Sequence, residues 1–586
     1  MSRTAIAGDT VAIHQVLAHW AETTPTALAF AFYDDDLVEV DRATYADLYR
    51  RAGRVAAALS AEHPRGAHVL ILLPPGLDYI VAIYGCFMAG MVAVSAAPPT
   101  PAQFDRALPR LKSIVNSADA QVVLSSRSLG EVAGKFATLE RRGTPVPWID
   151  FEGLPAVPAD PVPCGPDDLA FLQYTSGSTA EPRGVMLSHR NLMVNCAAIS
   201  ANFGTSSDTV CFSWLPPYHD MGLIGTILHP TLIGAPCHAI SPVTAIRRPM
   251  RWLQAMSRFK AEFSGGPNFM YDLCVRRHKH SDLAGLDLSH WRVAANGAEQ
   301  VRPTTLRAFT EAFGPIGFRP EAFSPAYGMA ETTLLLTTNG PVGATVAFFD
   351  EAGLRQGKAV PGQGVLLAGS GRVIEGHRVV VVDPDTGELC ADDTIGEVWA
   401  TGPSVAGGYW EAPEATGATF GARLAGGEDD SPYLRTGDLG FLMDGELFIT
   451  GRRKELIIIN GANHHPHDIE AAAEDGESLL RTHCSAAFAL EREGEARLGL
   501  VMEAAAGEHD LAVLQQVMAG VRARVAAAGG PRVDSLVLVP PRAVPKTTSG
   551  KIQRLRCRDM LLAGDLAIIG EWHAAKANDI ATAGRG

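Results

Sequence analysis

The sequence lacks the features that mark several large classes of protein. Its nine cysteines form no CxxC pair and are scattered along the chain, so it indicates neither a zinc framework nor a set of disulfides. It also lacks a basic excess, because 64 acidic residues outnumber 50 basic ones and leave a formal net charge of −14. Nucleic acids and anionic membranes are bound by basic surfaces, so we expect no nucleic-acid partner. A phosphate-bearing substrate would have to be held by a local site.

We also expect neither an export signal nor a transmembrane segment. Residues 1–8 contain one arginine but no apolar run long enough for a signal peptide. Residues 79–104 carry no charge, yet glycines interrupt them and they run into prolines. Such a stretch favours a buried helix followed by a buried strand over a bilayer span. Together with the dispersed thiols, these features predict a cytoplasmic protein.

What the sequence does contain is a repeated alternation of helix and strand signals. Thr44 and Asp47 have the spacing of a helix N-cap, and an alanine- and leucine-rich segment follows them. Short apolar strands are predicted at residues 68–73, 122–124 and 169–174. Strands that alternate with helices form a mostly parallel sheet covered on both faces, so we expect an α/β fold. A chain of 586 residues, 47% of them apolar, is too long for one ordinary domain.

The pattern changes in the second half of the chain. Residues 378–399 contain short strands separated by turn signals, and the Asp-Gly pair at 444–445 is typical of a two-residue hairpin. After Gly451 the charge density rises and a smaller helix-strand-helix pattern begins. We therefore expect two domains, residues 1–450 and 451–586.

The strongest single segment is YTSGSTAEPRGVMLSH, residues 174–189, between a predicted strand and a predicted helix. Its small and hydroxyl-bearing residues allow backbone amides to approach phosphate oxygens and add side-chain donors. The residues that carry this pattern are Thr175, Ser176, Gly177, Ser178 and Thr179. Taken alone, such a run is more often a flexible loop, and the GxxxxGKS/T order of a Walker loop is absent.

Further segments remove this ambiguity because they occur together in one order. They are WLPPYHDMGLIG (214–225), NGAE (296–299), YGMAE (327–331), RTGDLG (435–440), GRRKELIIINGANHHPHDIE (451–470) and PKTTSGK (545–551). With them, the chain resembles the acyl-activating superfamily of adenylate-forming enzymes over nearly its whole length. The resemblance implies a large N-terminal domain of stacked α/β subdomains plus a small β-barrel, and a smaller, mobile α+β C-terminal domain. It also implies ATP-dependent activation of a carboxylic acid as an acyl-AMP.

The matching positions imply a nucleotide site. The loop 175–179 would hold the ATP phosphates, and Glu331 would hold Mg²⁺, a hard cation suited to carboxylate and phosphate oxygens. The Tyr327 ring would stack on adenine and Asp438 would bind the ribose hydroxyls, although an aspartate in this setting is also common as a turn residue. The implied adenine and ribose site comprises Asn296, Gly297, Ala298, Ala326, Tyr327, Gly328, Met329, Asp438 and Arg452.

Lys551 is the residue that we expect to carry the chemistry. A carboxylate that attacks the α-phosphate brings two anions together, and a flexible ammonium that reaches both offsets the repulsion. The alternative is a solvated surface lysine. The resemblance places a hinge at Lys454 and places His219 where acyl and phosphate sites meet, although a lone histidine in an apolar segment is also compatible with a satisfied core residue. The histidines of 464–467 lack the other ligands of a metal site, so a polar loop before a helix beginning near Pro466 is expected instead.

Departures from the usual motifs point to one branch. The phosphate loop has Ala180 and Arg183 where Gly and Lys are usual, and YGMAE has Ala330 where Thr is usual. Together with SGGPNFMYDL (264–273), these features resemble fatty acyl-AMP ligases, which supply acyl chains to carrier proteins. An extra segment, residues 340–369, resembles the insertion that marks this branch. We therefore expect activation of a medium- or long-chain fatty acid and transfer to an acyl carrier protein, with a fatty acyl-CoA synthetase or an inactive binding relative as alternatives.

Two sets of apolar residues carry further expectations. Phe348 and Phe349 of the extra segment would rarely be exposed in a free loop, so we expect both to dock on the large domain. The alternative is an incidental surface hairpin. The acyl pocket is expected at Met221, Gly222, Ile224 and Phe269.

Overall fold

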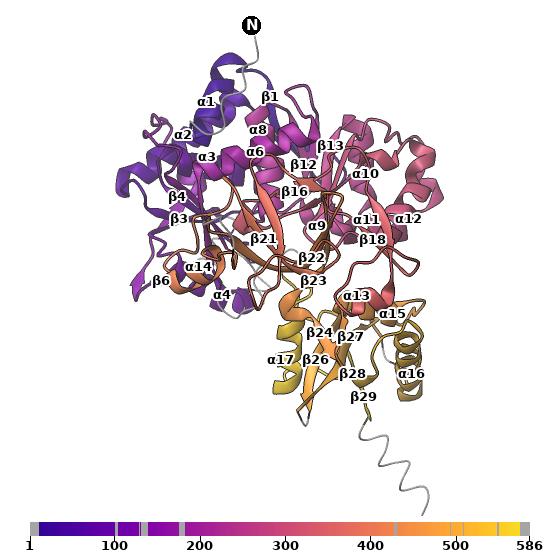
Figure 1. Cartoon of the computed structure of the whole chain (residues 1–586). Coiled ribbons are helices and arrows are strands. Elements are labelled where there is room, and N and C mark those ends of the chain that lie inside the picture. The colour runs from indigo at the N-terminus through magenta and orange to yellow at the C-terminus, as the bar shows by residue number, and fades with distance from the viewer. Residues whose placement is uncertain are drawn as a thin grey trace, which may run out of the picture.

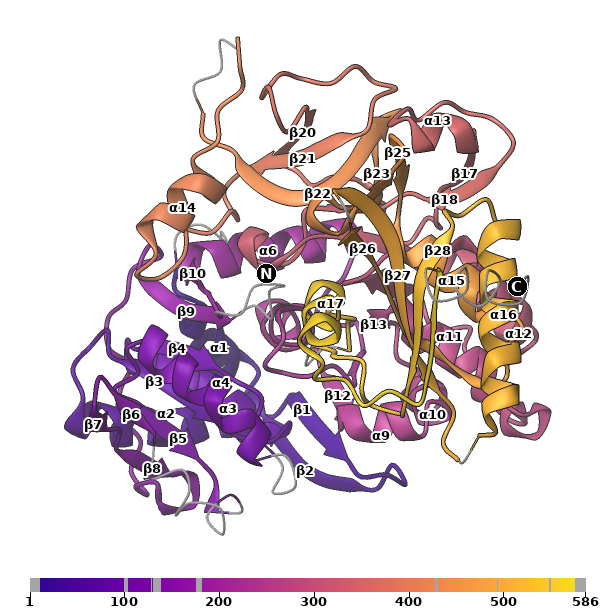
Figure 2. The same cartoon turned by 90° about the horizontal axis from the view of Figure 1, so that it is seen from below.

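The computed structural model consists of a large domain and a smaller C-terminal domain. It describes residues 11–99, 104–127, 129, 139–174, 182–426, 431–492, 494–507, 509–547 and 550–574. Figure 1 shows the C-terminal domain below the large one. Figure 2, seen from below, shows it in front of the right-hand half of the large domain.

The first part of the chain builds a compact α/β layer. Its helices and strands are α1 (Ile13–Thr23), β1 (Leu28–Tyr33), β2 (Glu39–Thr44), α2 (Tyr45–Glu62), β3 (His68–Leu72), α3 (Leu77–Met88), β4 (Val92–Ser95), α4 (Phe104–Ser117), β5 (Val122–Ser125), β6 (Glu140–Arg141), β7 (Thr144–Pro145), β8 (Trp148–Asp150), β9 (Leu169–Tyr174), β10 (Gly184–Ser188) and α6 (His189–Phe203). Six strands form a sheet in the order β10-β9-β4-β3-β5-β8. Its pairs are parallel except for the antiparallel pair of β9 and β10, which confirms the α/β expectation.

Local signals in the sequence explain several of these elements. The Thr44 hydroxyl accepts a hydrogen bond from the Asp47 N–H (3.2 Å) and caps α2. The uncharged stretch 79–104 contains most of the buried helix α3 and the buried strand β4, as predicted. Within the part of the chain that is described, no helix has the length and apolar character needed to cross a membrane.

The middle of the chain builds a second, larger sheet. Its elements are β11 (Cys211–Ser213), α7 (Asp220–Leu223), the π-helix η4 (Ile224–Leu228), α8 (His229–Ile233), β12 (Cys237–Ile240), α9 (Pro242–Arg247), α10 (Met250–Phe259), β13 (Phe263–Pro267), α11 (Asn268–Arg277), β14 (Val293–Gly297), α12 (Pro303–Phe313), β15 (Phe323–Tyr327), β16 (Thr337–Thr338), β17 (Val346–Phe349), α13 (Glu351–Arg355), β18 (Val365–Ala368), β19 (Arg372–Val373), β20 (Arg378–Val382), β21 (Gly396–Thr401), α14 (Pro413–Phe420), β22 (Leu434–Met443) and β23 (Glu446–Arg452). The strand order is β2-β1-β12-β11-β13-β14-β15-β16-β19-β23-β22-β21-β20.

This sheet changes character at β16. From β12 to β15 neighbouring strands are parallel, whereas from β16 onward they are antiparallel. The antiparallel end, which includes the short strands expected at residues 378–399, continues the large sheet. Strands β22 and β23 turn at Asp444 and Gly445, whose φ angles are 52° and 78°, so the Asp-Gly hairpin is confirmed.

The extra segment 340–369 forms a two-stranded ribbon, β17 paired with β18, with α13 between them. Phe349 is fully buried, and its ring lies 5.0 Å from that of Phe441 and 5.5 Å from that of Phe448. Phe348 remains 56% exposed. The expectation that both phenylalanines dock is therefore wrong for Phe348, because successive side chains of a strand point to opposite faces.

The C-terminal domain has its own sheet and core. Its elements are β24 (Ile457–Ile459), β25 (Ala462–His464), α15 (Pro466–Glu474), β26 (Leu480–Arg492), β27 (Glu495–Ala504), α16 (Leu511–Ala527), β28 (Val533–Val539), α17 (Arg554–Ala563) and β29 (Gly570–His573). Strands β26 to β29 form a four-stranded sheet in chain order. Its two buried apolar clusters contain only residues from Ile457 onward, which supports a boundary near Gly451. Helix α15 begins at Pro466, as expected from the polar loop before it.

Candidate active site

A cavity of about 1570 Å³ lies where the two domains meet. Its lining includes most of the predicted site residues, namely His219, Met221, Phe269, Gly297, Ala298, Ala326, Tyr327, Gly328, Met329, Glu331, Asp438, Arg452, Lys454 and Lys551. Three predicted residues, Asn296, Gly222 and Ile224, do not line it. The predicted phosphate loop, Thr175 to Thr179, lies outside the described residues.

Two glycines beside the cavity allow close contact with the backbone of a neighbouring segment. A Cβ at Gly297 would lie 2.6 Å from the carbonyl oxygen of Ala326, and one at Gly328 would lie 1.6 Å from that of Leu334. Ala298, directly after β14, has a φ of 66°, an unusual value for a residue with a Cβ. The NGAE and YGMAE segments therefore depend on glycine for packing against their neighbours.

Asn296 precedes Gly297 in β14, so its side chain lies on the opposite side of that strand. Its side chain is fully buried, and neither of its amide atoms has a hydrogen-bond partner among the described residues. Its neighbours Ala295 and Gly297 line the cavity. The alternation of a strand thus turns Asn296 away from the site in which it was expected.

Asp438 is the centre of a polar group on the cavity wall. Tyr327 Oη donates to Asp438 Oδ2 (2.8 Å), and Arg452 Nε lies 3.2 Å from Asp438 Oδ1. Asp438 lies within β22, directly opposite Arg452 of β23, rather than in a turn. Burial and the Asp438 carboxylate raise the pKa of Tyr327 well above its ordinary value, so its phenol keeps the proton that it donates. The Asp438 carboxylate also raises the pKa of Arg452.

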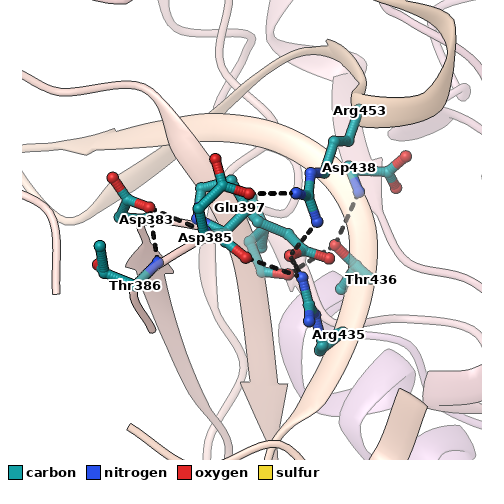
Figure 3. Close-up of polar contacts among 10 residues, drawn as sticks. Asp383, Asp385, Thr386, Glu397, Arg435, Thr436, Asp438 and Arg453 are labelled. Carbon is teal, nitrogen blue, oxygen red and sulfur yellow. Dashed lines mark hydrogen bonds and ion pairs between the residues drawn. The ribbon is translucent and has the colours of Figure 1, made fainter. Parts of the chain in front are cut away.

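Residues close to Asp438 also anchor the start of the C-terminal domain (Figure 3). Arg435 Nε donates to the buried carboxylate of Glu397 (3.1 Å). Arg453 Nη2 donates to Asp385 Oδ1 (2.7 Å), and its Nη1 lies 3.9 Å from Glu397 Oε2. Arg453, the residue before the predicted hinge Lys454, is therefore held by the large domain.

Lys551 enters the cavity from the C-terminal domain. Its loop is closed by two hydrogen bonds, from Thr547 N–H to the Lys551 carbonyl (2.8 Å) and from Lys551 N–H to Thr547 Oγ1 (3.0 Å). Burial and Arg452 lower the pKa of Lys551, while Asp220, Asp438 and Glu299 act in the opposite direction. Lys551 is thus not a solvated surface lysine, because it lies among charged groups of the large domain.

Glu331 is a buried carboxylate on the same cavity. It accepts a hydrogen bond from Tyr409 Oη (2.8 Å). Burial raises its pKa, and the Tyr409 hydrogen bond counteracts part of that rise. Nowhere in the described residues do three or more His, Cys, Asp or Glu side chains gather as a metal site. A single carboxylate suits Mg²⁺, which commonly takes its other ligands from substrate phosphates and water.

Comparison with known proteins identifies the family. Residues 17–410 match the family described as AMP-binding enzyme. This chain belongs to the AMP-binding enzyme family. It is 40% identical over 559 residues to the medium-chain-fatty-acid–acyl-carrier-protein ligase JamA of Moorena producens, an alignment that covers 93% of this chain and 94% of JamA. It is also 36% identical to the long-chain-fatty-acid–AMP ligase FadD26 of Mycobacterium marinum, covering 93% and 96% of the two chains.

Solved structures agree with this assignment. The fatty acyl-adenylate ligase of Legionella pneumophila, solved with acyl adenylate and pyrophosphate, superimposes with a TM-score of 0.72 at 37% identity, covering 96% of this chain and 98% of that one. These matches confirm the resemblance to fatty acyl-AMP ligases and the two-domain fold. The protein is an enzyme of the ATP-using adenylate-forming superfamily.

In this AMP-binding enzyme, His219 lies beside a carboxylate that sequence reasoning missed. His219 Nδ1 is 2.7 Å from Asp220 Oδ1, and both side chains line the cavity. Burial would raise the pKa of Asp220, but His219 and Lys551 lower it below its ordinary value. The adjacent His-Asp pair in WLPPYHDMGLIG was the available signal. His219 is partly exposed to the cavity rather than a satisfied core residue.

The apolar part of the cavity lining differs from the set of residues predicted for an acyl pocket. Met221 and Phe269 line the cavity, whereas Ile224 is buried in the core. A Cβ at Gly222 would lie 2.0 Å from the Pro216 carbonyl oxygen, so Gly222 is a packing residue. Sequence reasoning missed other apolar residues on the lining, namely Ile199, Phe203, Leu215, Phe263, Leu334 and Leu335. They come from several elements, and no single motif marks them.

Proposed function

We propose that this enzyme activates a medium- or long-chain fatty acid with ATP and Mg²⁺, releases pyrophosphate, and transfers the acyl group from acyl-AMP to an acyl carrier protein. The observation that carries the proposal is the position of Lys551. It lies in one cavity with the Tyr327–Asp438 pair and with apolar residues such as Phe263 and Phe269. The Lys551 ammonium lies between a nucleotide site and an apolar site. A fatty-acid carboxylate and the α-phosphate of ATP would meet at that place.

In the proposed first step, a carboxylate oxygen of the fatty acid forms a bond to the α-phosphorus of ATP. The bond from that phosphorus to the bridging oxygen of the β-phosphate breaks, and pyrophosphate leaves. Lys551 offsets the negative charge that both reactants bring to the phosphorus. Asp438, oriented by Tyr327 and Arg452, accepts hydrogen bonds from the ribose hydroxyls. Mg²⁺ held by Glu331 supplies positive charge to the phosphates when it is bound.

The phosphate loop, His219 and Lys454 keep the roles that the resemblance implies. The loop 175–179 holds the β- and γ-phosphates, His219 faces the reacting carboxylate, and Lys454 is the hinge between the domains. The nine cysteines are all free thiols, which fits a reducing cytoplasm.

A carrier-protein acceptor is supported by the names of two relatives. JamA and the TtuA protein of Teredinibacter turnerae, which is 34% identical over 614 residues, are both named as medium-chain-fatty-acid–acyl-carrier-protein ligases. A second candidate is a fatty acyl-CoA synthetase, because fadD21 of Mycobacterium leprae, 36% identical over 558 residues, is named a putative fatty-acid–CoA ligase.

Product analysis separates these candidates. The enzyme is incubated with ATP, Mg²⁺ and fatty acids of increasing length, alone, with CoA, and with a carrier protein bearing its phosphopantetheine thiol. We expect acyl-AMP in all cases and acyl-carrier protein only in the last. Each buried methylene contributes about 0.8 kcal/mol, roughly fourfold in affinity, until the pocket ends. Efficient acyl-CoA formation would instead identify a synthetase.

A further inference from the structure

His483 of the C-terminal domain contacts helix α11 of the large domain. His483 Nε2 lies 2.8 Å from Asp272 Oδ2, and Arg276 Nε, one turn further along α11, donates to the same oxygen at 2.8 Å. Only about a quarter of each side chain of the pair is exposed, 25% for His483 and 23% for Asp272. A polar contact of this kind, partly shielded from water, joins the two domains at the edge of the active-site cavity.

The backbone at His483 is held in an unusual conformation. Its φ is 56°, and it lies where the pairing of β26 with β27 shifts register between Leu480 and Ser485. Its N–H donates to Glu474 Oε2 (2.7 Å). A bulge redirects a side chain, and a left-handed conformation at a non-glycine residue persists only where its surroundings impose it. The bulge therefore directs this imidazole to α11.

The same residue contacts the loop that carries Lys551. The His483 carbonyl accepts a hydrogen bond from Lys546 Nζ (2.7 Å), which also lies 3.2 Å from Cys484 Sγ. Lys546 pairs with Ile552 across the base of the loop. A short series of contacts thus connects Asp272, through His483 and Lys546, to Lys551.

We propose that Asp272 and His483 form an interdomain latch that positions the Lys551 loop against the large domain for acyl-AMP formation. The latch rests on the proposed function, since Lys551 is its target. His483 is a positioning residue, because it acts on the reaction through Lys551. The charged and titratable groups that face the pair are Arg276, Glu474, Lys546 and Cys484. Burial would raise the pKa of Asp272, but His483 and Arg276 lower it below its ordinary value, so the latch carboxylate is ionised at neutral pH.

The latch matters for one half-reaction only. Formation of acyl-AMP needs the Lys551 ammonium at the α-phosphorus, and a misplacement of about 1 Å costs on the order of 10²-fold in rate. Transfer of the acyl group from acyl-AMP to a thiol involves attack at carbon. It does not bring two anions together at phosphorus, so it does not need the positioned ammonium.

The test uses variants of the full-length enzyme that keep the strained backbone. Asparagine tolerates a positive φ and is too short to reach α11, so His483→Asn breaks the latch, as does Asp272→Ala from the other side. We expect each to lower kcat for acyl-AMP formation by about 10- to 100-fold with little change in KM for ATP. Acyl transfer from supplied acyl-AMP to a thiol-bearing carrier protein should be retained.

A charge-reversed pair and a control complete the experiment. Asp272→His combined with His483→Asp restores the contact with the partners exchanged, and we expect it to recover much of the lost kcat. His509→Asn, at a histidine whose Nε2 lies 2.8 Å from the Ala505 carbonyl of its own domain, should have no effect. Normal acyl-AMP formation by both single variants would overturn the latch but not the proposed function. A parallel loss of both half-reactions without rescue would also overturn it, because it would indicate a merely structural role. If the unaltered enzyme makes no acyl-AMP from any fatty acid, the proposed function and the latch both fail.

Discussion

Arg453 and Glu455 lie two residues apart and are bound to different domains. Arg453 contacts Asp385 and Glu397 of the large domain, whereas Glu455 accepts a hydrogen bond from Arg554 Nη1 of the C-terminal domain at 2.7 Å. Lys454, between them, is the residue at which the two anchored segments meet. We therefore infer that a change in domain arrangement is concentrated at Lys454.

This anchoring predicts different effects for two arginines on the same carboxylate. Arg435→Gln removes the closest partner of the buried Glu397 and should lower the free energy of unfolding by about 2–4 kcal/mol. Arg453→Gln should lower the free energy of unfolding by less than about 1 kcal/mol, because the Arg453–Glu397 pair is longer and more exposed than the Arg435–Glu397 pair. It should nevertheless slow catalysis, because it loosens the hinge. Denaturant unfolding and steady-state kinetics on both variants check this. Equal loss of stability would contradict it.

The depressed pKa of Lys551 predicts an early loss of activity at alkaline pH. The protonated ammonium is the active form, so acyl-AMP formation falls as pH rises through this pKa. Because burial lowers it, kcat/KM should begin to fall at a lower pH than the titration of an exposed lysine would give. A pH profile of pyrophosphate exchange measures this. A rate that stays constant up to the pH at which exposed lysines lose their proton would count against the role of Lys551.

The contact between Tyr409 and Glu331 predicts a metal effect. The tyrosine hydrogen bond lowers the pKa of Glu331, which burial raises. Without it, as in Tyr409→Phe, the pKa of Glu331 rises further, so the carboxyl keeps its proton to a higher pH and binds Mg²⁺ less well in its protonated form. We expect the Mg²⁺ concentration for half-maximal rate to rise several-fold, most strongly at acidic pH. Glu331→Gln should lose most of the response to Mg²⁺. An unchanged Mg²⁺ titration in both variants would show that the metal is held elsewhere.

The two phenylalanines of the extra segment provide a matched pair. Phe349 is buried against Phe441 and Phe448, whereas Phe348 is exposed. Phe349→Ser should lower the free energy of unfolding by about 2–3 kcal/mol, because it removes the buried ring that holds the ribbon. If the ribbon restrains the C-terminal domain, this variant should also form more acyl-CoA, and Phe348→Ser should do neither. Thermal unfolding and separate quantification of acyl-AMP and acyl-CoA decide the matter. The same acyl-CoA yield from both variants would argue against the restraint.

The elements that were predicted correctly depend on local signals. The Thr44 cap, the Asp444-Gly445 hairpin and the Pro466 helix start each need only a few adjacent residues to form. Phe348 was expected to dock together with its neighbour, and Asn296 was assigned to the site with the whole of its motif. In both cases the face of the strand on which the residue lies was left out. Strand alternation, applied to VAANG and VAFF, would have corrected both.

Contacts between the domains were beyond sequence reasoning. Asp272 and His483 are 211 residues apart. Asp272 lies in the segment SGGPNFMYDL, but nothing in that segment points to a histidine of the C-terminal domain. Their meeting depends on a bulge in β26 and on the docking of a whole domain. Arg453 was visible in the sequence, but its partner Asp385 is 68 residues away in a turn, and nothing local links the two.

The central claim is that Lys551 enables a fatty acid to attack ATP in the cavity between the domains. The most direct measurement is Mg²⁺-dependent exchange of labelled pyrophosphate into ATP by the unaltered enzyme and by Lys551→Ala, with fatty acids and with amino acids. We predict exchange that requires a fatty acid, and a loss on the order of 10²–10³-fold in Lys551→Ala with ATP binding retained. Exchange driven by amino acids but not by fatty acids, or near-normal exchange by Lys551→Ala, would contradict the account.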